Sequence, residues 1–325
     1  MVSKALAKLI LAFGAVLPTP TVRWLARVIG RAVFWIPAAR HGLLLNAQHI
    51  LGADSSANER RNLAYGILDS FALAISDLIL ADRLWRHQIN NAVDEPPANV
   101  EIENFEKFTK INEDARQRGL VMVTLHMGSY EAACMLLTKQ REQVTIVYHR
   151  DPAGFFEELR SKQRTLFPIE EKPIDTSPFF AVDLLQRLRD GGTVLIAGEI
   201  AQQLHGENFP FLDGTAQFSP WPARLAVTAG VPILPAFIVR PGLESYRIHM
   251  EDAIHCSETD DPSQVMERLV KVFEVYVKRY PDQWLMVRPF WNESPAINQN
   301  DVNQNDPSES DRTPESRSAT QSSHA

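Results

Sequence analysis

Short apolar segments alternate with helical segments over the middle of the chain, and this alternation restricts the fold more than any other feature. Residues 120–125 (LVMVTL) form a continuous apolar run after Gly119. Similar runs follow at residues 144–148, 193–197, 233–239 and 246–250. Helical spacing of apolar residues separates these runs, at residues 130–139, 155–164, 179–189, 221–228 and 262–280. Apolar strands between helices are typical of a sheet that is covered on both faces. We therefore predict a single α/β domain with a mixed, mainly parallel sheet flanked by helices.

Residues 1–95 predict an N-terminal helical section that associates with a membrane. The apolar run from Leu9 to Leu17 is too short for a span, which needs about 20 residues. Arg23, Arg27 and Arg31 recur at four-residue intervals among tryptophans and aliphatic residues, which gives a helix one basic face beside apolar ones. Helices of this kind lie in the bilayer interface. A helix that packs on the core and exposes its arginines to solvent is the alternative.

Composition divides the rest of the chain into two parts. A break at residues 94–97 (DEPP) precedes the predicted α/β core, which we expect to extend over residues 96–292. Residues 293–325 are rich in Asn, Gln, Ser, Asp and Pro and contain almost no large apolar residues. Such a segment cannot bury enough surface to offset its ordering entropy, so we expect a disordered polar tail.

Charge and cysteine content exclude several classes of function. The net charge is −7, which argues against a nucleic-acid partner, because such proteins usually carry a basic surplus. The two cysteines, Cys134 and Cys256, form no CxxC pair, and no His/Asp cluster has metal-ligand spacing, so we expect no bound metal. The chain contains no GxSxG motif, no Walker loop and no GxGxxG motif.

The segment from His126 to Glu131 (HMGSYE) is the strongest candidate for a catalytic site. His126 follows an apolar strand, Gly128 permits a tight turn, and Glu131 opens the next helix. In open α/β sheets, ligands bind outside the carboxyl ends of the strands. An imidazole can take a proton from a hydroxyl near neutral pH, and a carboxylate on its other nitrogen orients it. We expect His126 to be a general base, Glu131 its orienting acid, and the acceptor substrate the nucleophile.

The spacing of this pair is not specific by itself, because the same histidine-to-acid interval occurs at His49 with Asp54 and at His255 with Asp260. Only His126 has a strand before it, a Gly-Ser turn after it, and then a helix. On the residues alone, a structural histidine remains an alternative to a catalytic one.

The motif resembles a known family. His126 to Glu131 resembles the HxxxxE/D motif of the lysophospholipid acyltransferases, and HMGSYE is similar to its form in the lipid A biosynthesis lauroyl/myristoyl acyltransferases. Further segments resemble conserved blocks of that family in the same order over residues 1–292: 147–150 with 159–164, 191–199, 209–214, 225–240 and 280–284. The chain departs from the family pattern at Glu199-Ile200 and at Val287-Arg288-Pro289, which puts the identity of the acceptor in doubt.

The resemblance implies an acyltransferase that moves a fatty acyl group from acyl-carrier protein or acyl-CoA to a hydroxyl or amine of a lipid or glycolipid. It implies no cofactor beyond the acyl thioester and a location at the cytoplasmic face of the inner membrane. Arginine suits bidentate phosphate binding, so the substrate-binding candidates include arginines at the matching blocks. The candidates are Arg150, Arg164, Glu199 and Arg240. For each of them a purely structural role is the alternative.

Three other functions remain open. A thioesterase or lipid esterase would use water in place of the acceptor. A non-catalytic relative would bind lipid without turnover. A third type of relative would acylate an acceptor other than lipid A.

Overall fold

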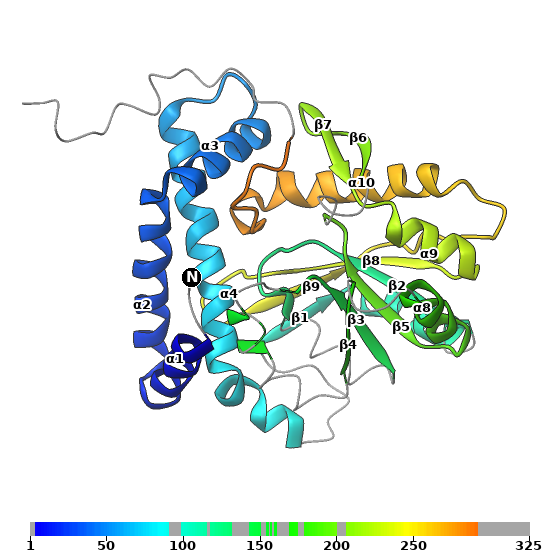
Figure 1. The fold of residues 1–325 in the computed structure, drawn as a ribbon, viewed down its shortest axis with the longest axis horizontal. Coiled ribbons are helices and arrows are strands. Elements are labelled where there is room, and N and C mark those ends of the chain that lie inside the picture. The colour runs from blue at the N-terminus through cyan, green and yellow to red at the C-terminus, as the bar shows by residue number, and fades with distance from the viewer. Residues whose placement is uncertain are drawn as a thin grey trace, which may run out of the picture. The chain divides into compact units, whose positions relative to one another are not determined.

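A seven-stranded sheet with the order β1-β9-β8-β2-β5-β3-β4 forms the centre of the computed structural model (Figure 1). Every neighbouring pair is parallel except β8–β9. This confirms the predicted mixed, mainly parallel sheet. The strands are β1 (Val100–Glu103), β2 (Leu120–Thr124), β3 (Val144–Tyr148), β4 (Ile169–Pro173), β5 (Thr193–Ala197), β8 (Ile233–Val239) and β9 (Tyr246–Met250), and β6 (Glu207–Phe211) and β7 (Gly214–Phe218) form a separate hairpin.

The structure describes residues 4–90, 99–115, 118–131, 143–150, 154, 155, 157, 159, 160, 169–174, 179–199 and 206–291. These residues lie in the unit Met1–Asn292. The predicted tail at residues 293–325, Arg164, and most of the helices predicted at residues 130–139 and 155–164 lie outside the described residues.

Helices cover both faces of the sheet. Successive side chains of a strand point to opposite faces, so each apolar strand packs against helices on both sides. Val121 and Val123 of β2 pack with residues of helices α8 (Phe180–Arg189), α9 (Trp221–Ala229) and α10 (Pro262–Arg279). Leu120 and Met122 of the same strand pack on the other face, with residues of α4 (Ala57–Asn90) and α5 (Phe105–Ala115). The fully apolar strands of the sequence are therefore buried from two sides.

The N-terminal helices pack together along α4 (Figure 1). They are α1 (Lys4–Val16), α2 (Thr19–Ala32) and α3 (Pro37–Leu51), with a 3₁₀ turn η1 (Val33–Trp35) between the last two. The sequence predicts one helical stretch over about residues 40–90, and the structure interrupts it at Gly52, whose φ is 91°. A capping box then starts α4: the Ser56 N–H donates to Glu59 Oε2 at 2.8 Å, and the Glu59 N–H donates to Ser56 Oγ at 3.2 Å.

The three arginines of α2 pair with acids of α4, and Arg23 is the one of them that is buried. Arg27 Nη2 lies 2.7 Å and Arg31 Nε 2.8 Å from the carboxylate of Asp69 on α4, and the side chain of Arg23 is only 5% exposed. The alternative with solvated arginines is wrong for Arg23, but the side chains of Arg27 and Arg31 stay 41% and 53% exposed while they pair with Asp69. Large apolar residues are also exposed in this section: Leu9, Phe13, Val16, Trp24, Val28, Ile29, Trp35 and Ile36.

One described helix has the length and apolar composition of a membrane span, namely α4 over Ala57–Ala81. Of its most apolar window, 61% is buried inside the protein. Much of the apolar surface of α4 packs against α1, α2 and α3.

The segment after α10 differs from the prediction. The apolar residues 284–287 (WLMV) predict a last strand, but the chain forms a 3₁₀ turn η2 (Pro281–Gln283) and then an extended segment that joins no strand ladder and forms one isolated bridge, between Trp284 and Met127. Its backbone bonds to the turn after β2 instead, since the Leu285 N–H donates to the His126 carbonyl at 2.8 Å and the Gly128 N–H to the Gln283 carbonyl at 2.9 Å. We call residues 280–291 the closing segment.

Four strands were not predicted, namely β1, β4, β6 and β7. β4 (IEEKP) is an edge strand of mixed polarity, so it lacks the apolar run of a central strand. β6 and β7 form an antiparallel hairpin with Leu212 at a φ of 56°. Leu212 is not a residue that usually marks a left-handed turn, which left the hairpin without its usual sequence signal.

Asn46 of α3 holds the closing segment in place. Its side chain is fully buried, its Nδ2 donates to the carbonyls of Met286 at 2.9 Å and Arg288 at 2.7 Å, and its Oδ1 accepts from the Phe290 N–H at 3.0 Å. We predict that Asn46→Ala lowers the free energy of unfolding by about 2–4 kcal/mol, because three backbone groups lose their partner. Urea denaturation measures this change. Lys271→Ala, which removes an exposed pair with Glu267, is the control and should stay within about 0.5 kcal/mol. An equal loss in both variants would contradict the role of Asn46.

Candidate active site

The parallel register of β2 and β5 brings His126 and Glu199 together. Thr124 of β2 pairs with Ala197 of β5, and each site residue lies two positions beyond its paired residue. The Gly198 N–H also donates to the Thr124 carbonyl at 2.8 Å, which continues the register past the strand ends. Both side chains therefore lie at the carboxyl edge of the sheet, where open α/β folds bind ligands.

Glu199 is buried and accepts hydrogen bonds from three donors. Its Oε1 accepts from the His126 backbone N–H at 2.6 Å and from Trp284 Nε1 at 3.1 Å, and its Oε2 lies 3.2 Å from His126 Nδ1. The Glu199 side chain is only 2% exposed. A buried carboxylate needs such partners, and here they fix both the backbone and the ring of His126.

The contact with Glu199 assigns the tautomer of His126. A carboxylate can only accept, so Nδ1 carries the hydrogen and Nε2 of the neutral ring has a lone pair. The ring is one-third exposed and lies edge-on to Tyr130, with 5.0 Å between centroids. Partial burial opposes the charged ring, but the carboxylates of Glu199 and Glu131 outweigh it and raise the pKa of His126 above its ordinary value.

Glu131, the acid of the sequence motif, is also buried near His126. It forms an ion pair with Arg160 at 3.5 Å, and the guanidinium of Arg160 lies 5.4 Å from the centroid of the Tyr148 ring. His126 Nδ1 contacts Glu199, so the carboxylate at this nitrogen follows the neighbouring strand β5 and lies outside the sequence motif.

Gly128 permits the tight turn between these residues. Its φ is 51°, and an added Cβ would lie 2.4 Å from the Ile238 carbonyl oxygen. Both backbone conformation and space therefore require glycine here.

The other predicted site residues have different positions. Arg150 follows β3 and is exposed, and Arg164 lies outside the described residues. The side chain of Arg240 is 7% exposed and forms an ion pair with Asp77 of α4, which favours the structural alternative for this residue. Ser129 is buried, and its hydroxyl donates to the same Asp77.

Sequence reasoning missed three residues that contact the site or its turn. Trp284 and Gln283 belong to a segment that resembles a family block, but no pattern indicated that they reach Glu199 and Gly128. Asp77 lies within an apolar helical repeat, where one acid among aliphatic residues was the only signal. Among the described residues, no three His, Cys, Asp or Glu side chains gather in a way that could hold a metal ion.

Comparison with known proteins is consistent with this geometry. The chain is 25% identical over 175 residues to a phosphatidylinositol mannoside acyltransferase of Mycobacterium tuberculosis strain CDC 1551 / Oshkosh. It has the same identity to the protein of that name from strain ATCC 25618 / H37Rv. Each match covers 53% of this chain and 54% of the relative, so the similarity spans about half of both. Residues 3–293 match the sequence model of a family described as bacterial lipid A biosynthesis acyltransferase. Because this match covers nearly the whole chain, the protein belongs to that family of acyltransferases.

Proposed function

We propose that this protein transfers a fatty acyl group from an acyl thioester to a hydroxyl or amine of a lipid or glycolipid, with His126 as the general base. The observation that carries the proposal is the hydrogen bond between His126 Nδ1 and buried Glu199, which leaves Nε2 as a proton acceptor at the carboxyl edge of the sheet. Membership of the acyltransferase family supports the reaction class.

In the proposed reaction, Nε2 of His126 takes the proton of the acceptor hydroxyl as its oxygen attacks the thioester carbonyl. The tetrahedral intermediate collapses, the C–S bond breaks, and the imidazolium returns the proton to the departing thiolate. Glu199 keeps the ring in the required tautomer and stabilises the imidazolium through Nδ1. Glu131 adds negative charge near the ring and holds Arg160.

The acceptor that we propose is a phosphate-bearing glycolipid. The relatives in Mycobacterium tuberculosis are named for a mannosylated phosphatidylinositol, and the family is named for lipid A. Arg150 is exposed after β3, the strand beside β5. A guanidinium at this edge suits a phosphate of the acceptor. Acyl-carrier protein and acyl-CoA both supply the thioester that the mechanism needs.

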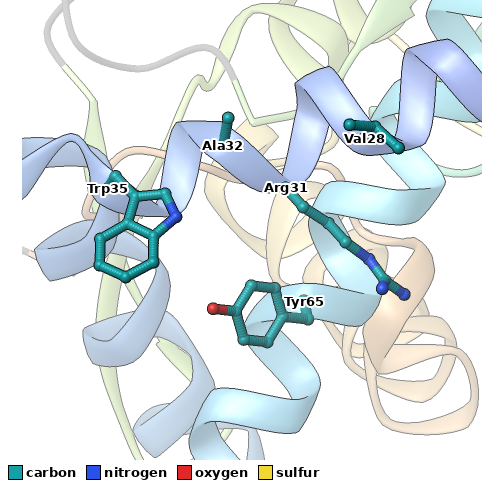
Figure 2. Close-up of a pocket in the computed structure, with 5 residues that line it drawn as sticks. All are labelled: Val28, Arg31, Ala32, Trp35 and Tyr65. Carbon is teal, nitrogen blue, oxygen red and sulfur yellow. The ribbon is translucent and has the colours of Figure 1, made fainter. Parts of the chain in front are cut away.

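We further propose that the outer surface of α1, α2 and η1 rests on the cytoplasmic face of the inner membrane. Trp24, Ile29 and Trp35 are 64%, 67% and 71% exposed, which is unusual for large apolar side chains on one surface. A recess of about 340 Å³ opens beside them, lined by Val28, Arg31, Ala32, Trp35 and Tyr65. Figure 2 shows the Trp35 and Tyr65 rings on opposite sides of this recess, from η1 and α4. Tryptophan, tyrosine and arginine are the residues that favour the headgroup region of a bilayer.

The first prediction concerns the base. We expect His126→Ala to lower acyl transfer from labelled acyl-carrier protein or acyl-CoA to a total lipid extract by about 10²- to 10⁴-fold. His255→Ala is the matched control, because His255 has the same spacing to an acid but is exposed in a loop. Mass spectrometry of the product identifies the acceptor.

The same assay separates the alternatives. Loss of the thioester without an acceptor would indicate a thioesterase, and that function also predicts that Ser129→Ala is as damaging as His126→Ala. Lipid binding that survives His126→Ala, with no product from either donor, would indicate a binding protein. An unimpaired His126→Ala enzyme would refute the general-base proposal.

The second prediction concerns pH. The base must be neutral, so the rate should rise as the pH rises through the elevated pKa of His126. Glu199→Gln removes the larger source of this elevation, so the acidic limb of the profile should move to lower pH and the plateau should fall. Glu131→Gln should move the limb in the same direction by a smaller amount. Profiles of kcat against pH measure both shifts, and a larger shift in Glu131→Gln would assign the orienting role to Glu131.

The third prediction concerns the membrane. We expect Trp24→Glu combined with Ile29→Glu to lower co-sedimentation with phospholipid vesicles by about tenfold or more, because two large apolar side chains would no longer enter the bilayer. Val275→Glu, at an exposed apolar residue of α10, is the control and should bind as the wild type does. Equal binding by all three proteins would contradict this docking surface.

A further inference from the structure

We propose that Asp77 is a positioning residue that holds the turn from His126 to Glu131 in its reactive geometry and ties it to helix α2. This inference rests on the proposed role of His126 as the base. Asp77 lies on α4, far from the turn in sequence, and its side chain is only 4% exposed. Three polar side chains from three other parts of the fold converge on it.

The first connection is direct. Ser129 lies between His126 and Glu131, is buried, and donates its hydroxyl hydrogen to Asp77 Oδ2. The turn residue between the base and the neighbouring acid therefore has its side chain anchored on α4. Removing the Asp77 carboxylate would leave the buried Ser129 hydroxyl without this hydrogen-bond partner, which costs folding free energy.

The second connection reaches the turn from its other side. Arg240, just after β8, binds Asp77 through Nη2. Its backbone N–H donates to Gln283 Oε1 at 2.7 Å, and its carbonyl accepts from Gln283 Nε2 at 3.0 Å. The carbonyl of Gln283 in turn accepts from the Gly128 N–H at 2.9 Å. Asp77 thus acts on Gly128 through Arg240 and Gln283, as well as on Ser129.

The third connection joins the turn to the apolar surface. Arg23 of α2 lies with Nη2 3.6 Å from Asp77 Oδ1, and its Nη1 donates to Glu244 at 2.9 Å. Trp24, the next residue of the same helix, belongs to the surface that we propose to meet the membrane. A single carboxylate therefore links the proposed membrane-docking helix with the backbone that carries His126.

Asp69 provides a matched comparison. It lies two helical turns earlier on α4 and also pairs with two arginines of α2, Arg27 and Arg31. Among the residues that the structure describes, its ion pairs go to α2, at a partly solvated site with a side-chain exposure of 16%. Both acids fasten α2 to α4, but only Asp77 also contacts the turn. A comparison of variants of Asp69 and Asp77 therefore distinguishes an effect on the position of His126 from an effect on the packing of α2 against α4.

The experiment compares wild type, Asp77→Asn, Ser129→Ala and Asp69→Asn in the full-length protein. Hydrogen–deuterium exchange measures the protection of the amides of residues 125–131, two of which donate to Glu199 and to the Gln283 carbonyl. Acyl-transfer kinetics give kcat and KM separately. Ser129→Ala keeps both arginine pairs of Asp77, so it tests the direct connection even if Asp77→Asn fails to fold.

We expect exchange in residues 125–131 to be faster in Asp77→Asn and in Ser129→Ala, and unchanged in Asp69→Asn. We expect kcat to fall by about tenfold or more in Asp77→Asn at a similar KM, since a small displacement of a base is costly. Unchanged exchange in folded Asp77→Asn and Ser129→Ala, or an equal effect in Asp69→Asn, would overturn the proposal. If the wild type transfers no acyl group, the proposed function fails, while the exchange data still decide whether Asp77 orders the turn.

Discussion

The site depends on one buried charge. Glu199 lies at the end of β5 with almost no solvent contact, so its carboxylate requires partners within the protein. Those partners are the backbone and ring of His126 and the indole of Trp284. Satisfying this one group therefore aligns two neighbouring strands, the turn after β2, and the closing segment. The contact at Nδ1 also gives His126 the tautomer that the proposed general-base role requires.

The closing segment connects this site with the N-terminal helices. Its backbone bonds to the turn after β2, and Asn46 of α3 binds it from the opposite side. Asp77 adds a second connection through Ser129 and Arg240. These hydrogen bonds and ion pairs thus connect the helices that carry the exposed apolar surface with the backbone around His126. For the proposed function, this connection joins the surface that we propose to meet the membrane with the site that we propose to receive a lipid acceptor.

The arginines of α2 show why amphipathic patterns need a structure to interpret them. The sequence shows that one face of the helix is basic and that the others are apolar, but not which residues meet the protein. Asp69 and Asp77 of α4 decide this, because Asp77 pairs with Arg23 and Asp69 pairs with Arg27 and Arg31. Arg23 is consequently buried, whereas Arg27 and Arg31 are paired at the surface and stay partly exposed.

The sequence alone determined five of the seven strands of the central sheet and the location of His126. Continuous apolar runs at β2, β3, β5, β8 and β9 mark buried strands, and this pattern is local, so it can be read without a structure. The sequence could not predict β1, β4 or the β6–β7 hairpin, which lack such a run, and it wrongly added a strand at residues 284–287. The tertiary structure decided which acid contacts the Nδ1 of His126. Glu131 is near in sequence, but Glu199 becomes a neighbour only through the parallel register of β2 with β5, and strand pairing is a long-range interaction that no local pattern records.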